Sequence, residues 1–203
     1  MVFGFAGAHR SGKTTLAKDV SDALGIHFHQ TNTAEMLARH GIDPVGKHGL
    51  VDRLEIQRLI LKNHLAELAR LPRPVIVDRT PADMFAYMAA EVTMHNTAQE
   101  FGEYVDAYRL DCIDAIRTHY DTITVCRPLT YFERNLAKPP ENLAYQWQIQ
   151  YLIEGILNHG EMSHLARFYL RTNDRKERAG LMNTQIASRI NELAQERKTV
   201  SVH

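Results

Sequence analysis

The residues best placed to do chemistry lie near the amino terminus, where residues 7–14 read GAHRSGKT. Gly7 and Gly12 allow backbone angles that other residues avoid, so successive N–H groups can turn inward around phosphate oxygens. Lys13 adds a positive charge for the β- and γ-phosphates, and Thr14 adds a hydroxyl for Mg²⁺. The helix expected to follow would add the attraction of its N-terminus for anions. The spacing therefore predicts a loop that binds the phosphates of a nucleotide.

A second segment, Val75-Ile76-Val77-Asp78, is a short apolar run that ends in an aspartate. Mg²⁺ bound to a nucleotide needs a carboxylate on its far side, either directly or through water. We therefore expect ATP and Mg²⁺ as cofactors, with Thr14 and Asp78 as the metal-binding residues. The whole loop is expected to contact the nucleotide, which makes the candidate binding residues Gly7, Ala8, His9, Arg10, Ser11, Gly12, Lys13, Thr14 and Thr15.

Short apolar runs alternate with long amphipathic segments along the chain, which indicates alternating strands and helices. The expected strands are residues 2–6, 26–29, 75–78, 122–126 and 166–170. The expected helices are residues 14–24, about 34–40, 50–71, two pieces between 81 and 120, 141–159 and 175–197. This alternation predicts a parallel sheet with helices on both faces, in which ligands bind beyond the carboxyl ends of the strands.

With these features the chain resembles the nucleoside and nucleotide kinases of the P-loop superfamily. The resemblance rests on the GAHRSGKT loop, on the strand that ends in Asp78-Arg79-Thr80-Pro81, on an arginine-rich segment after the fourth strand, and on the length of 203 residues. It implies a three-layer α/β fold, a five-stranded parallel sheet in the order 2-3-1-4-5, and a helical lid at about residues 127–140. The pair Asp78-Arg79 resembles the acidic residue and arginine that end this strand in thymidylate and deoxynucleoside kinases. The resemblance assigns Asp78 to the metal or to acceptor activation, and Arg79 to acceptor positioning.

The resemblance also identifies a lid, which would close over ATP and bring cations to the transferred phosphoryl group. Its cationic residues would be Arg127, Arg134 and Lys138. The catalytic candidates are then Lys13, Asp78, Arg79, Arg127 and Arg134.

The segment after the second expected strand is where such kinases bind the acceptor. Glu35 and Arg39 lie in this segment and are, with Arg79, the candidate substrate-binding residues. Because they are four residues apart, these two side chains could equally pair with each other on a water-facing side of a helix.

The composition is that of a globular protein, with 44% hydrophobic and 24% charged residues, which excludes a disordered or fibrous chain. The 24 Lys and Arg residues balance the 24 Asp and Glu residues, so no overall positive charge attracts nucleic acid or anionic lipid. The length fits a single domain over residues 1–203. The two cysteines are far apart, and neither a signal peptide nor an apolar run near the ~20 residues of a membrane span is present, so we expect a cytoplasmic protein without a membrane partner.

The leading hypothesis is an ATP- and Mg²⁺-dependent kinase for a nucleoside, a nucleotide or a related small acceptor. A homodimer is left open, because many such kinases dimerise through helices. One alternative keeps the chemistry but acts on a hydroxymethylated pyrimidine base in DNA, with the basic lid and the aromatic residues near Trp147 as contacts. The zero net charge disfavours this nucleic-acid partner. Another alternative is a P-loop ATPase or switch that acts on a protein partner, for which the sequence carries no marker.

Overall fold

The structure is a computed structural model, and it describes residues 1–43, 46–95, 100–129, 142–162 and 165–200. Within these ranges, five parallel strands form one sheet in the order β2-β3-β1-β4-β5. In register, Gly4 of the central strand lies opposite Val77 on one side and Ile123 on the other. The predicted sheet and its order are confirmed. The strands are β1 (Val2–Ala6), β2 (His27–His29), β3 (Val75–Val77), β4 (Thr122–Cys126) and β5 (Ala166–Leu170).

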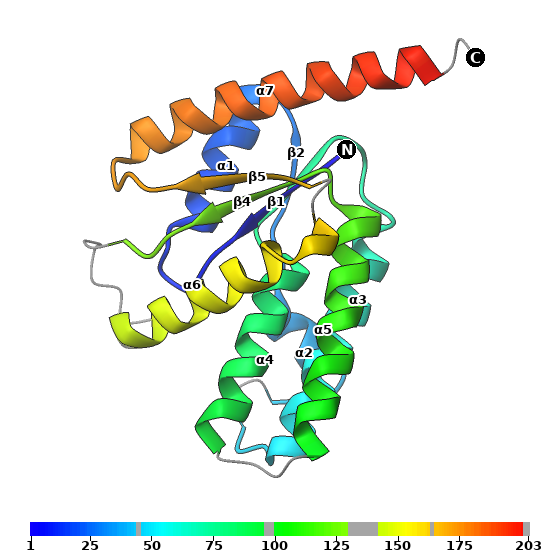
Figure 1. Ribbon diagram of the computed structural model, residues 1–203, viewed down its shortest axis with the longest axis vertical. Coiled ribbons are helices and arrows are strands. Elements are labelled where there is room, and N and C mark those ends of the chain that lie inside the picture. Colours follow the sequence, from blue (N-terminus) through cyan, green and yellow to red (C-terminus); the bar gives the residue numbers. More distant parts are fainter. Residues whose placement is uncertain (44–45, 96–99, 130–141, 163–164, 201–203) are drawn as a thin grey trace.

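Helices cover both faces of this sheet, which gives three layers (Figure 1). One face carries α1 (Lys13–Leu24) and α7 (Arg175–Val200), which pack against each other. The opposite face carries α3 (Leu50–Leu68), α4 (Pro81–His95), α5 (Glu100–His119) and α6 (Leu143–Leu157). The short helix α2 (Thr33–Arg39) packs against α3, and a 3₁₀ turn (Gly160–Met162) precedes β5.

The central strand β1 is buried on both faces because helices cover the sheet on each side. Phe3 and Phe5 point into the core formed with α1 and α7, whereas Val2 and Ala6 point into the larger core on the other face. Burying a side chain such as Phe stabilises the fold by about 1.5–3 kcal/mol relative to leaving it in water. The sheet is thereby held rigidly, and its carboxyl edge can present a site.

Two expected helices are shorter in the structure. The helix expected at 50–71 ends at Leu68, because the amides of Arg70 and Leu71 bond three residues back and tighten the chain into a turn. The helix expected at 141–159 spans Leu143–Leu157, with the Asn142 side chain accepting a hydrogen bond from the Tyr145 amide as an N-cap. Among the described helices, none is long and apolar enough to cross a lipid bilayer.

A buried histidine makes the stability of this fold depend on pH. His64 of α3 is hydrogen-bonded to the Tyr120 hydroxyl at 2.7 Å, and burial lowers its pKa to about 3. The folded protein therefore keeps His64 neutral, whereas the unfolded chain takes up a proton below its ordinary pKa of about 6.5. Stability is lost as the pH falls through this window, by about 2 kcal/mol between pH 7 and pH 5. Urea unfolding at both pH values should show this loss in the wild type and a smaller one in His64→Gln; equal losses in the two proteins would contradict it.

Candidate functional site

The loop between β1 and α1 adopts a conformation that fits phosphate binding. Gly12 has a φ of +78° and Arg10 a φ of +60°, so the backbone turns through left-handed angles at both positions. Gly7 has a φ of +152°, and a Cβ atom there would lie 2.3 Å from the Cys126 carbonyl oxygen. Only glycine fits at position 7, because a side chain there would collide with the backbone at the end of β4. Because α1 begins at Lys13, its N-terminus points at this loop.

Lys13 lies over this loop, with its Nζ atom donating to the carbonyl oxygens of Gly7 at 2.7 Å and Ala8 at 3.1 Å. Burial lowers the pKa of Lys13, and the nearby Asp83 carboxylate, whose Oδ1 is 4.0 Å from Nζ, opposes that shift. The ammonium group is thus held at the loop, where it would meet the phosphates of a bound nucleotide.

Asp83 also contacts this loop, and the sequence analysis does not identify it. Its buried carboxylate accepts from the Gly7 amide at 2.9 Å and from the Thr80 amide and hydroxyl at 2.9 and 2.8 Å. Burial raises the pKa of Asp83, while Lys13 and the Gly7 N–H oppose the increase. The spacing Thr80-x-x-Asp83 is a capping-box signature for the start of α4, and it could have revealed the bond to Thr80. The bond to Gly7 joins residues 76 positions apart, and local sequence carries no signal for it.

Asp78 follows β3 and faces the loop across the end of the sheet. Its Oδ2 atom accepts from the Thr14 hydroxyl at 2.8 Å, and its Oδ1 atom accepts from the Thr31 amide at 2.9 Å. A carboxylate and a hydroxyl side by side, next to a phosphate cradle, fit the oxygen-ligand preference of Mg²⁺. The structure therefore brings together the two residues that the sequence assigns to the metal.

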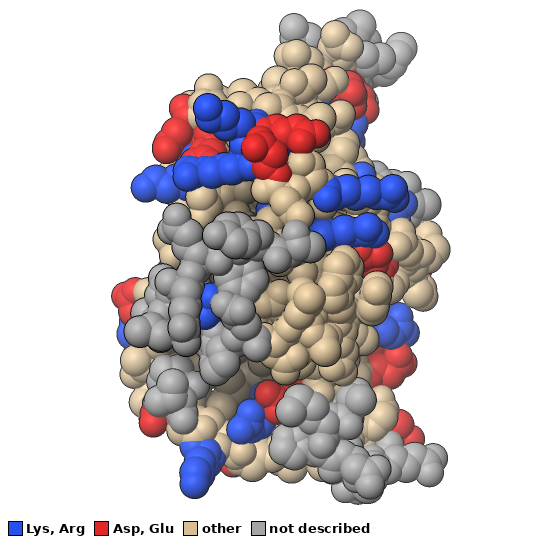
Figure 2. Space-filling view, turned by 90° about the vertical axis from the view of Figure 1, so that its left-hand side faces the viewer, with Lys and Arg blue, Asp and Glu red and all other residues tan. Residues whose placement is uncertain are grey.

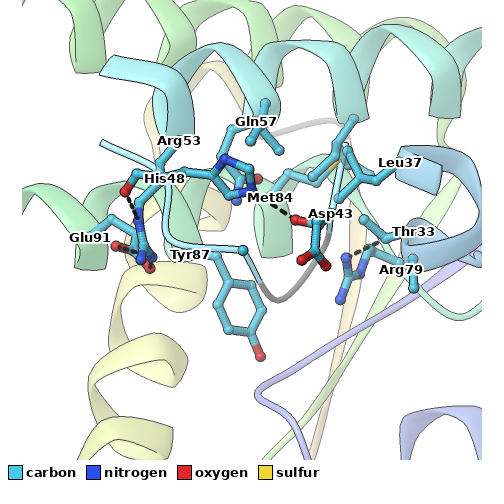
Figure 3. Close-up of a pocket in the computed structure, with 14 residues that line it drawn as sticks. Thr33, Leu37, Asp43, His48, Arg53, Gln57, Arg79, Met84, Tyr87 and Glu91 are labelled. Atoms are coloured by element: carbon cyan, nitrogen blue, oxygen red, sulfur yellow. Dashed lines mark hydrogen bonds and ion pairs between the residues drawn. The ribbon is translucent and has the colours of Figure 1, made fainter. Parts of the chain in front are cut away.

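Arg79 points from the same strand end towards a cavity of about 540 Å³ that α2, α3 and α4 enclose (Figure 3). Its Nη1 atom donates to the Thr33 hydroxyl at 2.8 Å, and its guanidinium lies 5.9 Å from the centre of the Tyr87 ring. The cavity begins beside the loop, because Tyr87 lines it and also bonds the His9 amide at 2.9 Å. The lining residues are Thr33, Ala34, Leu37, Asp43, Gly46, His48, Arg53, Ile56, Gln57, Ile60, Arg79, Met84, Tyr87 and Glu91.

The other two candidate substrate residues do not line this cavity. Glu35 is bonded to the N-cap residue Asn32, whose side-chain nitrogen donates to the Glu35 carboxylate at 2.8 Å. Arg39 is paired with Glu67 of α3 at 3.5 Å rather than with Glu35. The reason is the helical period of 3.6 residues, which directs Thr33, Ala34 and Leu37 into the cavity and turns positions 35 and 39 away.

Of the three candidate cations of the lid, the structure describes one. Arg127 directly follows β4, and its Nε atom donates to the Glu154 carboxylate at 3.2 Å, which also accepts from Gln150 at 2.8 Å. Arg127 is therefore held against α6. Arg134 and Lys138 lie outside the described residues.

A second residue that sequence reasoning missed is Arg178 in the first turn of α7. Its side chain is buried beside the loop, and a Cβ atom on Gly12 would lie 3.4 Å from its Nη1 atom. Among the described residues, its Nε and Nη2 atoms have no hydrogen-bond partner. A buried cation with unsatisfied N–H groups is costly without an anion nearby, so its position fits a phosphate ligand at the loop. A charged residue at a helix start usually faces water, which is why the sequence gives no signal for it.

Comparison with known proteins supports this description of the fold. Residues 2–178 match the model of a family described as an AAA domain. No curated protein matches the sequence significantly.

Solved structures of deoxyadenosine kinase from M. mycoides share the fold. The structure with bound dCTP is 16% identical, with a TM-score of 0.64 over 93% of this chain and 100% of that chain. The structure with dCMP and a flexible dCDP is 16% identical, with a TM-score of 0.65 over 93% and 99% of the two chains. The structure with dATP is 14% identical, with a TM-score of 0.66 over 92% and 100%. The phosphate loop, the order of the sheet and the family match lead to one conclusion: this chain belongs to the AAA domain family of P-loop proteins and has the nucleoside-kinase-like fold of that superfamily.

Proposed function

We propose that this protein is a kinase that transfers the γ-phosphate of ATP to a hydroxyl group of an uncharged, nucleoside-like acceptor. The observation that carries the proposal is the junction of two sites, a phosphate loop and a cavity of about 540 Å³ that meet at Tyr87. An ATPase or switch needs the loop alone, whereas a kinase needs a second binding site within reach of the γ-phosphate. The likeness to deoxyadenosine kinase structures supports the same proposal.

The lining of the cavity favours an uncharged acceptor. Among the described residues, the charged side chains of its lining are two arginines and two carboxylates, and the Arg53 guanidinium is paired with both oxygens of Glu91 at 3.1 Å. A nucleoside monophosphate would bring about two negative charges into this balanced lining, and burying them without matching cations is costly. Apolar side chains and the Gln57 amide instead suit a flat ring with hydrogen-bonding edges. The apolar side chains are Leu37, Ile56, Ile60 and Met84.

Each residue of the site then has a role. The loop amides and Lys13 bind the phosphates, and Arg79 positions the hydroxyl end of the acceptor. Thr14 and Asp78 would hold Mg²⁺, which would neutralise charge on the phosphates when bound. The acceptor oxygen bonds to the γ-phosphorus as the bond to the β–γ bridging oxygen breaks, the hydroxyl proton is released to water, and ADP leaves. From the length of the sequence we also infer a single domain, and from its two distant cysteines we infer a cytoplasmic location.

An ATP-consumption screen tests this proposal. It would compare nucleosides, nucleoside monophosphates, nicotinamide riboside and DNA containing hydroxymethylated pyrimidines, each with and without Mg²⁺. We expect Mg²⁺-dependent ADP release with at least one nucleoside and much slower release with its monophosphate. Faster turnover of the monophosphates would contradict the argument from cavity charge. The same ADP release with every acceptor and with none would favour the ATPase alternative.

The DNA alternative has a separate test. Among the described residues on the face shown in Figure 2, Lys and Arg lie beside Asp and Glu rather than in one basic stripe. A protein that covers several phosphates normally presents such a stripe. In filter binding at two salt concentrations we therefore expect no salt-sensitive affinity for DNA. A DNA affinity that falls steeply with salt would support this alternative instead.

A further inference from the structure

Helix α4 holds the phosphate loop by two side chains on one of its faces. Asp83 accepts from the Gly7 amide and Tyr87 accepts from the His9 amide, both at 2.9 Å. Because these residues are four positions apart, they lie one above the other on the helix. The two amides are alternate residues of the loop, so α4 fixes the loop at two points rather than one.

The same helix forms a wall of the cavity, to which it contributes Met84, Tyr87 and Glu91. Tyr87 lines the cavity, and its hydroxyl also accepts a hydrogen bond from the loop at the His9 amide. Figure 3 shows its ring at the cavity and its hydroxyl directed away from α3. Burial raises the pKa of Tyr87 to about 12, so the hydroxyl keeps its proton at neutral pH. A ligand in the cavity would therefore rest against a ring whose far end is attached to the loop.

We propose that Tyr87 is a positioning residue that couples the two sites, so that an acceptor in the cavity fixes the phosphate loop for ATP. The acceptor packs against the Tyr87 ring and restricts its movement. The hydroxyl then holds the His9 amide, and the loop amides that bind phosphate stay in their cradle. This inference rests on the proposed function, since it needs an acceptor in the cavity. By linkage, each substrate raises the affinity of the other by the same factor.

The test must separate the effect of the Tyr87 hydroxyl from the effect of packing against its ring. Three rings cluster here, with Tyr145 of α6 centred 5.9 Å from the His9 ring and 6.5 Å from the Tyr87 ring. Tyr87→Phe keeps the ring in the cavity and removes only the acceptor for the His9 amide. Tyr145→Phe removes a hydroxyl from the same cluster while leaving the bond between Tyr87 and His9 intact, which makes it the matched control.

The experiment is calorimetric binding of a non-hydrolysable ATP analogue with Mg²⁺, without acceptor and with the nucleoside identified in the screen. In the wild type we expect the nucleoside to tighten analogue binding several-fold. In Tyr87→Phe we expect binding of the analogue alone to weaken by about tenfold, because the part-buried His9 N–H loses its partner. The nucleoside should no longer tighten analogue binding in this variant, yet should bind the free variant within about twofold of the wild type, because the ring remains. Tyr145→Phe should resemble the wild type in both measurements.

Each outcome decides between explanations. Wild-type analogue affinity and unchanged coupling in Tyr87→Phe would overturn the inference. Equal losses in Tyr87→Phe and Tyr145→Phe would also overturn it, because ring packing would then explain the effect. Should the wild type bind ATP but no acceptor, the proposed function and the coupling fail together, and weakened analogue binding in Tyr87→Phe would still show that Tyr87 holds the loop. Thermal melting of the three proteins confirms that each variant is folded.

Discussion

Replacing Lys13 with alanine should lower kcat for phosphoryl transfer by about a thousandfold or more. The transferred group carries charge on three oxygens, and a fixed cation stabilises that charge most strongly where water is excluded. Lys13 is already held at the loop by the carbonyl oxygens of Gly7 and Ala8, so little reorganisation is needed when phosphate arrives. The measurement is ADP release at saturating ATP and nucleoside, together with calorimetric binding of ATP.

The matched control is Lys18→Ala, which removes the same charge from an exposed position on the same helix. It should keep kcat within about twofold, because surface charges away from a site contribute little. Phosphoryl transfer by Lys13→Ala within tenfold of the wild type would contradict the role given to this ammonium group.

The parts of the site that sequence predicts are those that depend on neighbouring residues. The conformation of the loop from Gly7 to Thr14 is predictable from the spacing of its glycines and lysine, because the left-handed angles at Gly7 and Gly12 are set by those residues themselves. The ends of β4 and β5 are predicted correctly for the same reason, since apolar runs and charged flanks define them locally. Asp78 could be found because it ends an apolar strand.

The remaining parts depend on contacts between distant segments. The bond between Tyr87 and the His9 amide spans 78 positions, and the pairing of Arg53 with Glu91 spans 38. No local pattern distinguishes Tyr87 from an ordinary core residue, because its helix is apolar on several sides. Glu35 and Arg39 show a related limit of local sequence: their segment does lie beside the cavity, but the helical phase turns Thr33, Ala34 and Leu37 towards it instead.

The second prediction with a large effect concerns Asp78. In Asp78→Asn we expect kcat to fall by about a hundredfold or more and the Mg²⁺ concentration for half-maximal rate to rise. The wild-type carboxylate accepts from the Thr14 hydroxyl and the Thr31 amide with separate oxygens. Asparagine has the same shape but only one oxygen, so its NH₂ group faces one of those donors, and the charge that attracts the metal is lost.

Calorimetry separates these effects from a general loss of folding. Binding of ADP without Mg²⁺ should be nearly unchanged in Asp78→Asn, because the loop amides and Lys13 still bind the phosphates. The gain in affinity that Mg²⁺ gives the wild type should shrink in the variant. Asp22→Asn, which neutralises an exposed carboxylate on α1, serves as the control and should behave like the wild type. If Asp78→Asn keeps both the wild-type kcat and the wild-type Mg²⁺ requirement, the metal is held elsewhere, and the pairing of Asp78 with Thr14 only joins the end of β3 to the start of α1.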